Sequence, residues 1–179
     1  MKTYLQNILN IGLLFAGALL FTHCDNNDPE PQNENELMVT FTPQAGGSPV
    51  VYNNLNEEGN GTIDPALDER STYAVTIEVR NIKEDKDLTE EIEDENTSYQ
   101  FFYQISSDLD LAFDYTDSDM NGNPIGLTSV FVARSASSGT MKVTLKQGLD
   151  KSAAGAVNGD PTNAGGETEI EATFNVVIE

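Results

Sequence analysis

Apolar and polar residues alternate along most of the chain after Glu36. The clearest case is LDLAFDY, residues 109–115, in which Leu, Leu, Phe and Tyr are separated by Asp, Ala and Asp. A period of two places alternate side chains on opposite faces, so it predicts strands with one buried and one solvated face. On this basis we predict strands over residues 37–41, 49–52, 72–80, 99–105, 109–115, 127–133, 141–145 and 170–178.

Segments rich in Gly, Asn, Asp and Ser separate these strands, among them QAGGS, SSD, DSDMNGNP and SASSG. Such residues favour turns, and we expect residues 37–41 and 49–52 to pair across QAGGS. The one helical candidate, residues 87–94, is short and nearly all acidic, and we interpret it as an ordered loop or a single turn. Short, regularly spaced strands predict an all-β fold, an antiparallel Ig-like β-sandwich of about 7–9 strands over residues 37–179.

The chain begins with a different pattern. Lys2 precedes an apolar run, residues 8–21, which only Asn10 interrupts. A basic start and a short apolar run are typical of a secretory signal peptide, and a membrane span needs about 20 apolar residues. We therefore predict a signal peptide over residues 1–23 and a flexible, acidic tether over residues 24–36, with an uncleaved N-terminal anchor as the alternative.

The only cysteine, Cys24, follows this run and precedes acidic and amide residues that cannot form a core. The stretch resembles a bacterial lipobox, in which the cysteine thiol receives a diacylglycerol. It departs from that pattern at His23, where Gly, Ala or Ser is usual, and at Phe21, where Leu is usual. Lipoproteins of the Bacteroidota carry such departures, and acidic residues after the cysteine resemble their surface-export signal. The resemblance implies lipidation at Cys24 and a lipid-anchored protein of the outer membrane, exposed at the cell surface.

Composition narrows the classes of function. Removing residues 1–23 removes the only histidine, and acylation would use the only thiol. Ser-His-Asp and Cys-His nucleophilic sites, and zinc bound by His or Cys, are thereby excluded. The chain has the Asp and Glu residues that a glycosidase needs for its pair of catalytic carboxylates. However, it has no Trp, and a small sandwich leaves little room for a sugar cleft. We therefore expect a protein that is not an enzyme.

The formal net charge of −21 argues against binding to nucleic acid and against adsorption to anionic lipid. Such a charge suits an exported domain that stays in solution, and we expect a monomer. Acidic residues also attract cations, although a solvated surface is the alternative interpretation.

One motif suggests a cation site. Asp117, Asp119, Asn121 and Gly122 reproduce the D-x-D-x-N-G start of a calcium loop, in which oxygen ligands alternate and the glycine permits a sharp turn. Thr128 stands at the twelfth position, where an EF-hand needs a bidentate Glu, and strands flank the loop. The motif is therefore not an EF-hand, and we predict a Ca²⁺ or similar hard-cation site there. The alternative is a hairpin turn, rich in residues that tolerate positive φ.

Two further segments are candidates for function. Residues 83–95 concentrate carboxylates that could gather a metal or steer a basic partner, and the alternative is a solvated edge that discourages aggregation. Residues 147–169 form a long connection without a phosphate-binding pattern. Connections of that length are often functional, and a mobile surface loop is the alternative.

The order YQFFYQI, DYTDSDMNGNPIGL, ASSGTMKVTLKQ and DKSAAGAVNGDPTNAGGETEIEATFNVVIE resembles a group of small flavobacterial surface lipoproteins of unknown function. Members are often labelled "type 1 periplasmic binding fold", a two-lobed α/β fold whose size and helix–strand alternation this chain lacks. Some are associated with outer-membrane receptors for nutrient uptake. The resemblance implies a non-catalytic binding module, accessory to a nutrient or metal uptake receptor. A structural or adhesive surface module with a cation-stiffened loop is the alternative.

Overall fold

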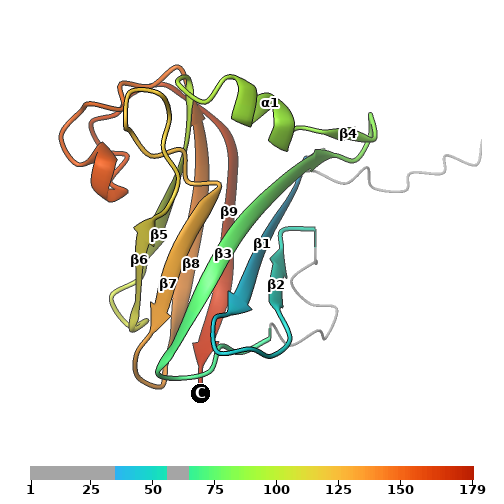
Figure 1. The fold of residues 1–179 in the computed structure, drawn as a ribbon, viewed down its shortest axis with the longest axis vertical. Coiled ribbons are helices and arrows are strands. Elements are labelled where there is room, and N and C mark those ends of the chain that lie inside the picture. The colour runs from blue at the N-terminus through green and yellow to red at the C-terminus, as the bar shows by residue number, and fades with distance from the viewer. Residues whose placement is uncertain (1–34, 56–64) are drawn as a thin grey trace, which may run out of the picture. The chain divides into compact units, whose positions relative to one another are not determined.

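Two antiparallel sheets pack face to face as a β-sandwich (Figure 1). The computed structural model describes residues 35–55 and 65–179, so the predictions for residues 1–34, Cys24 included, lie outside it. One sheet has the strand order β2-β1-β3-β7-β6 with β4 paired to β3, and the other has the order β5-β8-β9. The strands in the described residues are β1 (Asn35–Pro43), β2 (Val50–Asn53), β3 (Ser71–Asn81), β4 (Lys86–Asp87), β5 (Tyr99–Ile105), β6 (Leu111–Tyr115), β7 (Thr128–Ala133), β8 (Ser137–Gln147) and β9 (Glu167–Ile178).

The predicted all-β, Ig-like sandwich is confirmed, and each predicted strand is present; β5 has the predicted ends, and the other strands differ at one or both ends. The predicted pairing of β1 with β2 is also confirmed. The predicted turn SASSG is wrong in its second half, because β8 begins at Ser137. Gly139 permits this, since a Cβ there would lie 2.2 Å from the Ser106 Oγ atom. A glycine inside a strand often marks such a close approach.

Residues Thr89–Asp94 form a short α-helix, α1, where the sequence predicted an ordered loop or a single turn. The Asp87 Oδ1 atom accepts the Thr89 backbone N–H at 2.8 Å, and Ile92 packs into the core with 3% of its surface exposed. Glu90 and Glu91 occupy the first turn, where negative charge interacts favourably with the helix dipole. The short strand β4, which precedes α1, was not predicted from the sequence.

Aromatic side chains from both sheets fill the centre of the sandwich. The Phe131 ring lies 5.1 Å from that of Tyr103 in the opposite sheet, 5.2 Å from that of Phe41 and 5.4 Å from that of Phe113. Edge-to-face and offset contacts of this kind stabilise a core beyond the area that they bury. The inward positions of the alternating pattern therefore form the core, as the sequence predicted.

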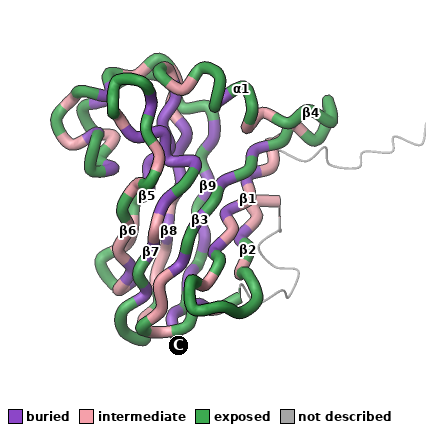
Figure 2. The backbone as a smooth tube through the Cα atoms, viewed as in Figure 1, coloured by how far each residue is buried: buried purple, intermediate pink, exposed green. Residues whose placement is uncertain are grey.

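Strand β5 does not follow the predicted alternation of buried and wet faces. Tyr99, Phe101 and Tyr103 face the core, but Gln100 and Phe102 on the other face are also fully buried. Figure 2 shows buried backbone positions along the strands. The connection from β8 to β9 covers this second face, and Ala156 and Ala164 together with Phe102 form a separate small apolar cluster. This connection contains the short 3-10 helix η1 (Ala156–Asn158). The long loop is thus a packed layer on the sandwich.

Candidate functional site

Asp117 organises the connection between β6 and β7. Its Oδ1 atom accepts the backbone N–H of Gly126 at 2.8 Å and that of Ile125 at 3.3 Å, and its Oδ2 atom accepts the N–H of Thr128 at 2.8 Å. A carboxylate that accepts several amides fixes the path of the backbone around it. Asp117 therefore holds the end of this connection in register with the start of β7.

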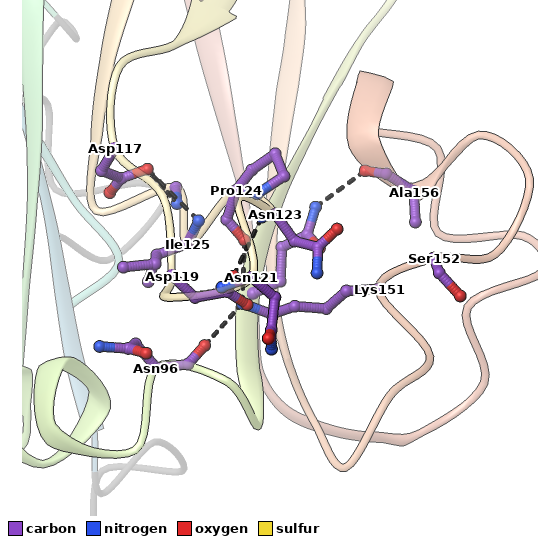
Figure 3. A network of polar contacts seen from close by, with 12 residues as sticks. Asn96, Asp117, Asp119, Asn121, Asn123, Pro124, Ile125, Lys151, Ser152 and Ala156 are labelled. Carbon is purple, nitrogen blue, oxygen red and sulfur yellow. Dashed lines mark hydrogen bonds and ion pairs between the residues drawn. The ribbon is translucent and has the colours of Figure 1, made fainter.

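Asp119 has a second internal role in the same connection (Figure 3). Its Oδ1 atom accepts the backbone N–H groups of Asn121 and Asn123 at 2.9 and 3.0 Å, the geometry of an Asx turn. Its Oδ2 atom lies 3.1 Å from the Nζ atom of Lys151, and the Asp119 side chain is fully buried. Asn121 itself is exposed and contributes its backbone N–H to the turn.

Lys151 comes from the long loop, and its ammonium group is buried among three acceptors. The Nζ atom donates to the backbone oxygen of Asn96 at 2.6 Å, to that of Pro124 at 3.0 Å and to the Asp119 carboxylate at 3.1 Å. An ammonium group has three donors, so each of them is used, and 4% of the side chain remains exposed. This lysine connects three segments that are distant in the sequence.

Burial and partners oppose each other in setting the pKa values of this pair. Burial raises the pKa of Asp119, but the N–H groups of Asn123 and Asn121 and the ammonium of Lys151 outweigh it, so the pKa lies below its usual range. Burial lowers the pKa of Lys151, and the Asp119 carboxylate opposes that change without cancelling it. Asp119 is therefore ionised at neutral pH, and its charge is paired inside the protein.

A cleft of about 510 Å³ opens beside β6. Its walls come from β6, from the connection that Asp117 and Asp119 organise, and from η1. The lining residues are Phe113, Asp114, Tyr115, Asp117, Gly122, Pro124, Val157 and Asn158.

Contacts beneath the surface fix the elements that line the cleft. The Lys151–Asp119 ion pair joins the long loop to the β6–β7 connection, and the Gln100 Nε2 atom donates to the backbone oxygen of Ala156 at 2.8 Å. Gly159 passes so close to β6 that a Cβ there would lie 2.7 Å from the Phe113 Cζ atom. The buried ion pair, the hydrogen bond and the close approach of Gly159 to Phe113 together fix the position of the long loop beside β6.

The predicted calcium ligands Asp117, Asp119 and Asn121 lie near one another, but their oxygens have other partners. The oxygens of both carboxylates accept backbone N–H groups or face the Lys151 ammonium, and Asn121 points to solvent (Figure 3). Calcium needs six to eight oxygen ligands that face inward. Within residues 35–55 and 65–179, no group of three or more His, Cys, Asp or Glu side chains could hold a metal ion. Calcium binding remains a prediction from the sequence, and the contacts favour its alternative, a structural turn.

The other acidic candidate, residues 83–95, is largely exposed. Arg80 and Asp85 form an ion pair at 2.8 Å, and Lys86 pairs with Glu91. Such exposed pairs contribute little to stability, so the contacts favour the interpretation of this segment as a solvated edge.

Sequence reasoning missed Lys151 and the cleft. The lysine lies in a loop of small and polar residues, and no local pattern distinguishes it from an exposed lysine. One sequence signal pointed to a covering layer. Phe102 is a large apolar residue at a β5 position that the alternation predicts to be wet, and in the structure both Phe102 and Gln100 are buried on that second face.

No family model, curated protein or solved structure matches the chain. In the part of the chain that the structure describes, no helix has the length and apolar character required to cross a membrane.

Proposed function

We propose that the protein is anchored to the outer membrane through a lipid on Cys24 and acts at the cell surface as a non-catalytic binding module, accessory to an uptake receptor. The observation that carries this proposal is the cleft beside β6, whose walls are fixed by buried polar contacts. A site that is rigid before binding loses less conformational entropy when a ligand arrives. A buried ion pair contributes little net stability, because removing both charges from water costs free energy. This supports a role for Lys151 and Asp119 in positioning the loops.

The lining of the cleft supports binding over catalysis. The Asp117 oxygens accept three backbone N–H groups, so this carboxylate is committed to holding the loop. Asp114 is the other acid of the lining, and it is exposed to solvent. A general acid or base needs a proton partner within hydrogen-bond reach, and a nucleophile needs an adjacent base. The lining offers an acidic and aromatic surface for recognition.

The membrane anchor is tested by replacing Cys24 with Ser. We expect the wild-type protein to pellet with outer membranes and to resist carbonate extraction, and the Cys24→Ser protein to appear in the soluble fraction with an unchanged melting temperature. A Cys24→Ser protein that still pellets and resists carbonate would show that another segment anchors it.

The binding role is tested by photo-cross-linking on intact cells. A photoreactive amino acid at Asn158, on the cleft, is compared with one at Glu78, an exposed position on β3. We expect Asn158 to yield a discrete adduct with an outer-membrane receptor, and Glu78 to yield none. Equal labelling from both positions, or adducts only between copies of this protein, would favour the structural or adhesive module instead.

A further inference from the structure

Strand β6 ends its sheet, and the cleft lies along it. In the strand order β2-β1-β3-β7-β6, β7 is the only one of the described strands that pairs with β6. The Arg134 N–H donates to the Asp110 oxygen, and the Thr116 N–H donates to the Thr128 oxygen. In an antiparallel pair, the residues that bond to the neighbour alternate with those that point away from it. The even-numbered residues of β6 therefore bond to β7.

The odd-numbered residues Phe113 and Tyr115 consequently direct their backbone N–H and C=O groups away from β7, at the edge that lines the cleft. No backbone partner for these groups occurs among the described residues. Two such residues lie about 7 Å apart along a strand, which matches the spacing of alternate residues in any extended chain. Exposed strand edges are normally short, charged or covered, because they are templates for pairing.

The edge of β5, in the other sheet, has backbone groups that are already hydrogen-bonded. The Phe101 N–H donates to the Ile125 oxygen at 2.7 Å, and the Phe101 oxygen accepts the Tyr115 hydroxyl at 2.8 Å. The β6–β7 connection and the Tyr115 side chain thus block the β5 edge at this position. The fold leaves the β6 edge open, beside a cleft that can hold another chain.

We propose that the cleft binds an extended peptide segment of a partner protein, in which basic and apolar residues alternate, by adding it to β6 as an antiparallel strand. This inference rests on the proposed binding function and names the ligand class. Main-chain hydrogen bonds to Phe113 and Tyr115 supply affinity, as in other cases of strand addition. Peptide residues opposite Phe113 and Tyr115 would lie on the inward, apolar face of the sheet. The peptide residue opposite Asp114 would lie on the outward face, beside the Asp114 carboxylate.

Charge decides between possible occupants of the edge. Asp114 is exposed on β6, Asp117 lies beside it in the cleft, and the chain carries a net charge of −21. A second copy would bring an equal negative charge and a second Asp114 to the same edge. A basic segment of another protein is attracted, and Val157 on the opposite wall, 47% exposed, offers it an apolar contact.

The probe is an end-capped octapeptide of alternating valine and lysine, titrated into the ¹⁵N-labelled full chain in mild detergent. We expect the amide signals of Phe113 and Tyr115 to shift and their hydrogen exchange to slow, because both N–H groups acquire acceptors. An octapeptide of alternating valine and glutamate should cause no shift.

Methylated peptides test the geometry. In the proposed register the valine amides face β6 and the lysine amides face solvent. N-methylation of every valine should abolish the shifts at Phe113 and Tyr115, and N-methylation of every lysine should preserve them. Equal effects of the two methylation patterns would overturn strand addition.

Two variants with the same charge change complete the test. Asp114→Lys should weaken binding of the valine–lysine peptide at least several-fold, whereas Glu78→Lys, on the exposed face of β3, should leave it within about twofold, as rim charges act locally. Absence of shifts at Phe113 and Tyr115, shifts confined to other residues, or dimerisation through β6 in sedimentation would overturn the inference. The cross-linking experiment tests the proposed function separately. A receptor adduct at Asn158, together with unchanged amide signals in the peptide titration, would overturn the strand-addition inference alone.

Discussion

Lys151 shows how a single side chain can set the shape of a site that it does not line. Its ammonium group joins the segment after α1, the β6–β7 connection and the long loop through Asn96, Pro124 and Asp119. An unpaired charge at this depth would be strongly destabilising, so both partners must be present for either to be tolerated. The loops must therefore take the one arrangement that brings Lys151 and Asp119 together.

A double-mutant cycle tests this coupling. We expect Lys151→Met to lower the free energy of unfolding by about 3–5 kcal/mol, because it leaves the Asp119 charge buried without a cation. Asp119→Asn, which keeps the Oδ1 acceptor of the turn, should cost a similar amount. The double variant should be more stable than the sum of the two losses predicts, as measured by urea denaturation. Strictly additive losses would show that the pair is not coupled.

The depressed pKa of Asp119 predicts how stability depends on pH. A carboxyl group whose pKa is lower in the folded state stabilises that state above its unfolded pKa of about 4, and the effect is lost as pH falls through the folded pKa. The pKa of Asp119 is lowered from 3.8. We expect the difference in unfolding free energy between wild type and Asp119→Asn to be constant between about pH 5 and pH 7 and to shrink below about pH 4. Other carboxyl groups are common to both proteins and cancel in this comparison. A difference that stays constant down to pH 2 would contradict it.

At the scale of elements, the sequence predicted those strands whose burial follows the simple alternation. It predicted β6 and the core face of β5 because alternate large apolar residues are a local signal. It could not predict that the β8–β9 connection covers the second face of β5, because that contact joins residues such as Gln100 and Ala156 across a long stretch of sequence. The carboxylates Asp117 and Asp119 were found by their spacing, but their partners are backbone amides and a lysine that no local pattern reveals.

Alanine substitutions at two glycines of the β6–β7 connection distinguish the cost of a strained backbone from the cost of steric crowding. Gly122 and Gly126 have φ values of +83° and +85°, but a Cβ at Gly122 meets nothing within 4 Å, whereas one at Gly126 lies 2.8 Å from the Phe101 oxygen. We expect Gly122→Ala to cost about 1–2 kcal/mol for its left-handed backbone. Gly126→Ala should cost about 1–3 kcal/mol more, because the close neighbour is backbone and cannot move aside. Urea denaturation of both variants measures the difference, and equal costs would mean that the space around Gly126 is not restricted.

At the scale of the whole molecule, a strongly acidic chain folds around an aromatic core, and among the described residues Lys151 is the one buried cation, at the candidate site. The ammonium is paired with the Oδ2 atom of Asp119, one of the residues predicted to bind the cation. This arrangement favours a loop that is held by the protein itself over one that is stiffened by calcium.

Thermal melts of the metal-stripped protein decide between these two interpretations. A ligand that binds only the native state raises its stability by about 2.7 kcal/mol at a hundred times the dissociation constant, which is a shift of several degrees for a domain of this size. We expect calcium to raise the melting temperature no more than magnesium does at the same ionic strength, because both ions only screen the repulsion among surface carboxylates. Choline chloride at matched ionic strength gives the screening effect alone. A calcium-selective shift that disappears in Asp117→Asn would establish a cation site at this loop, and the Lys151–Asp119 pair would then have to open to admit the ion.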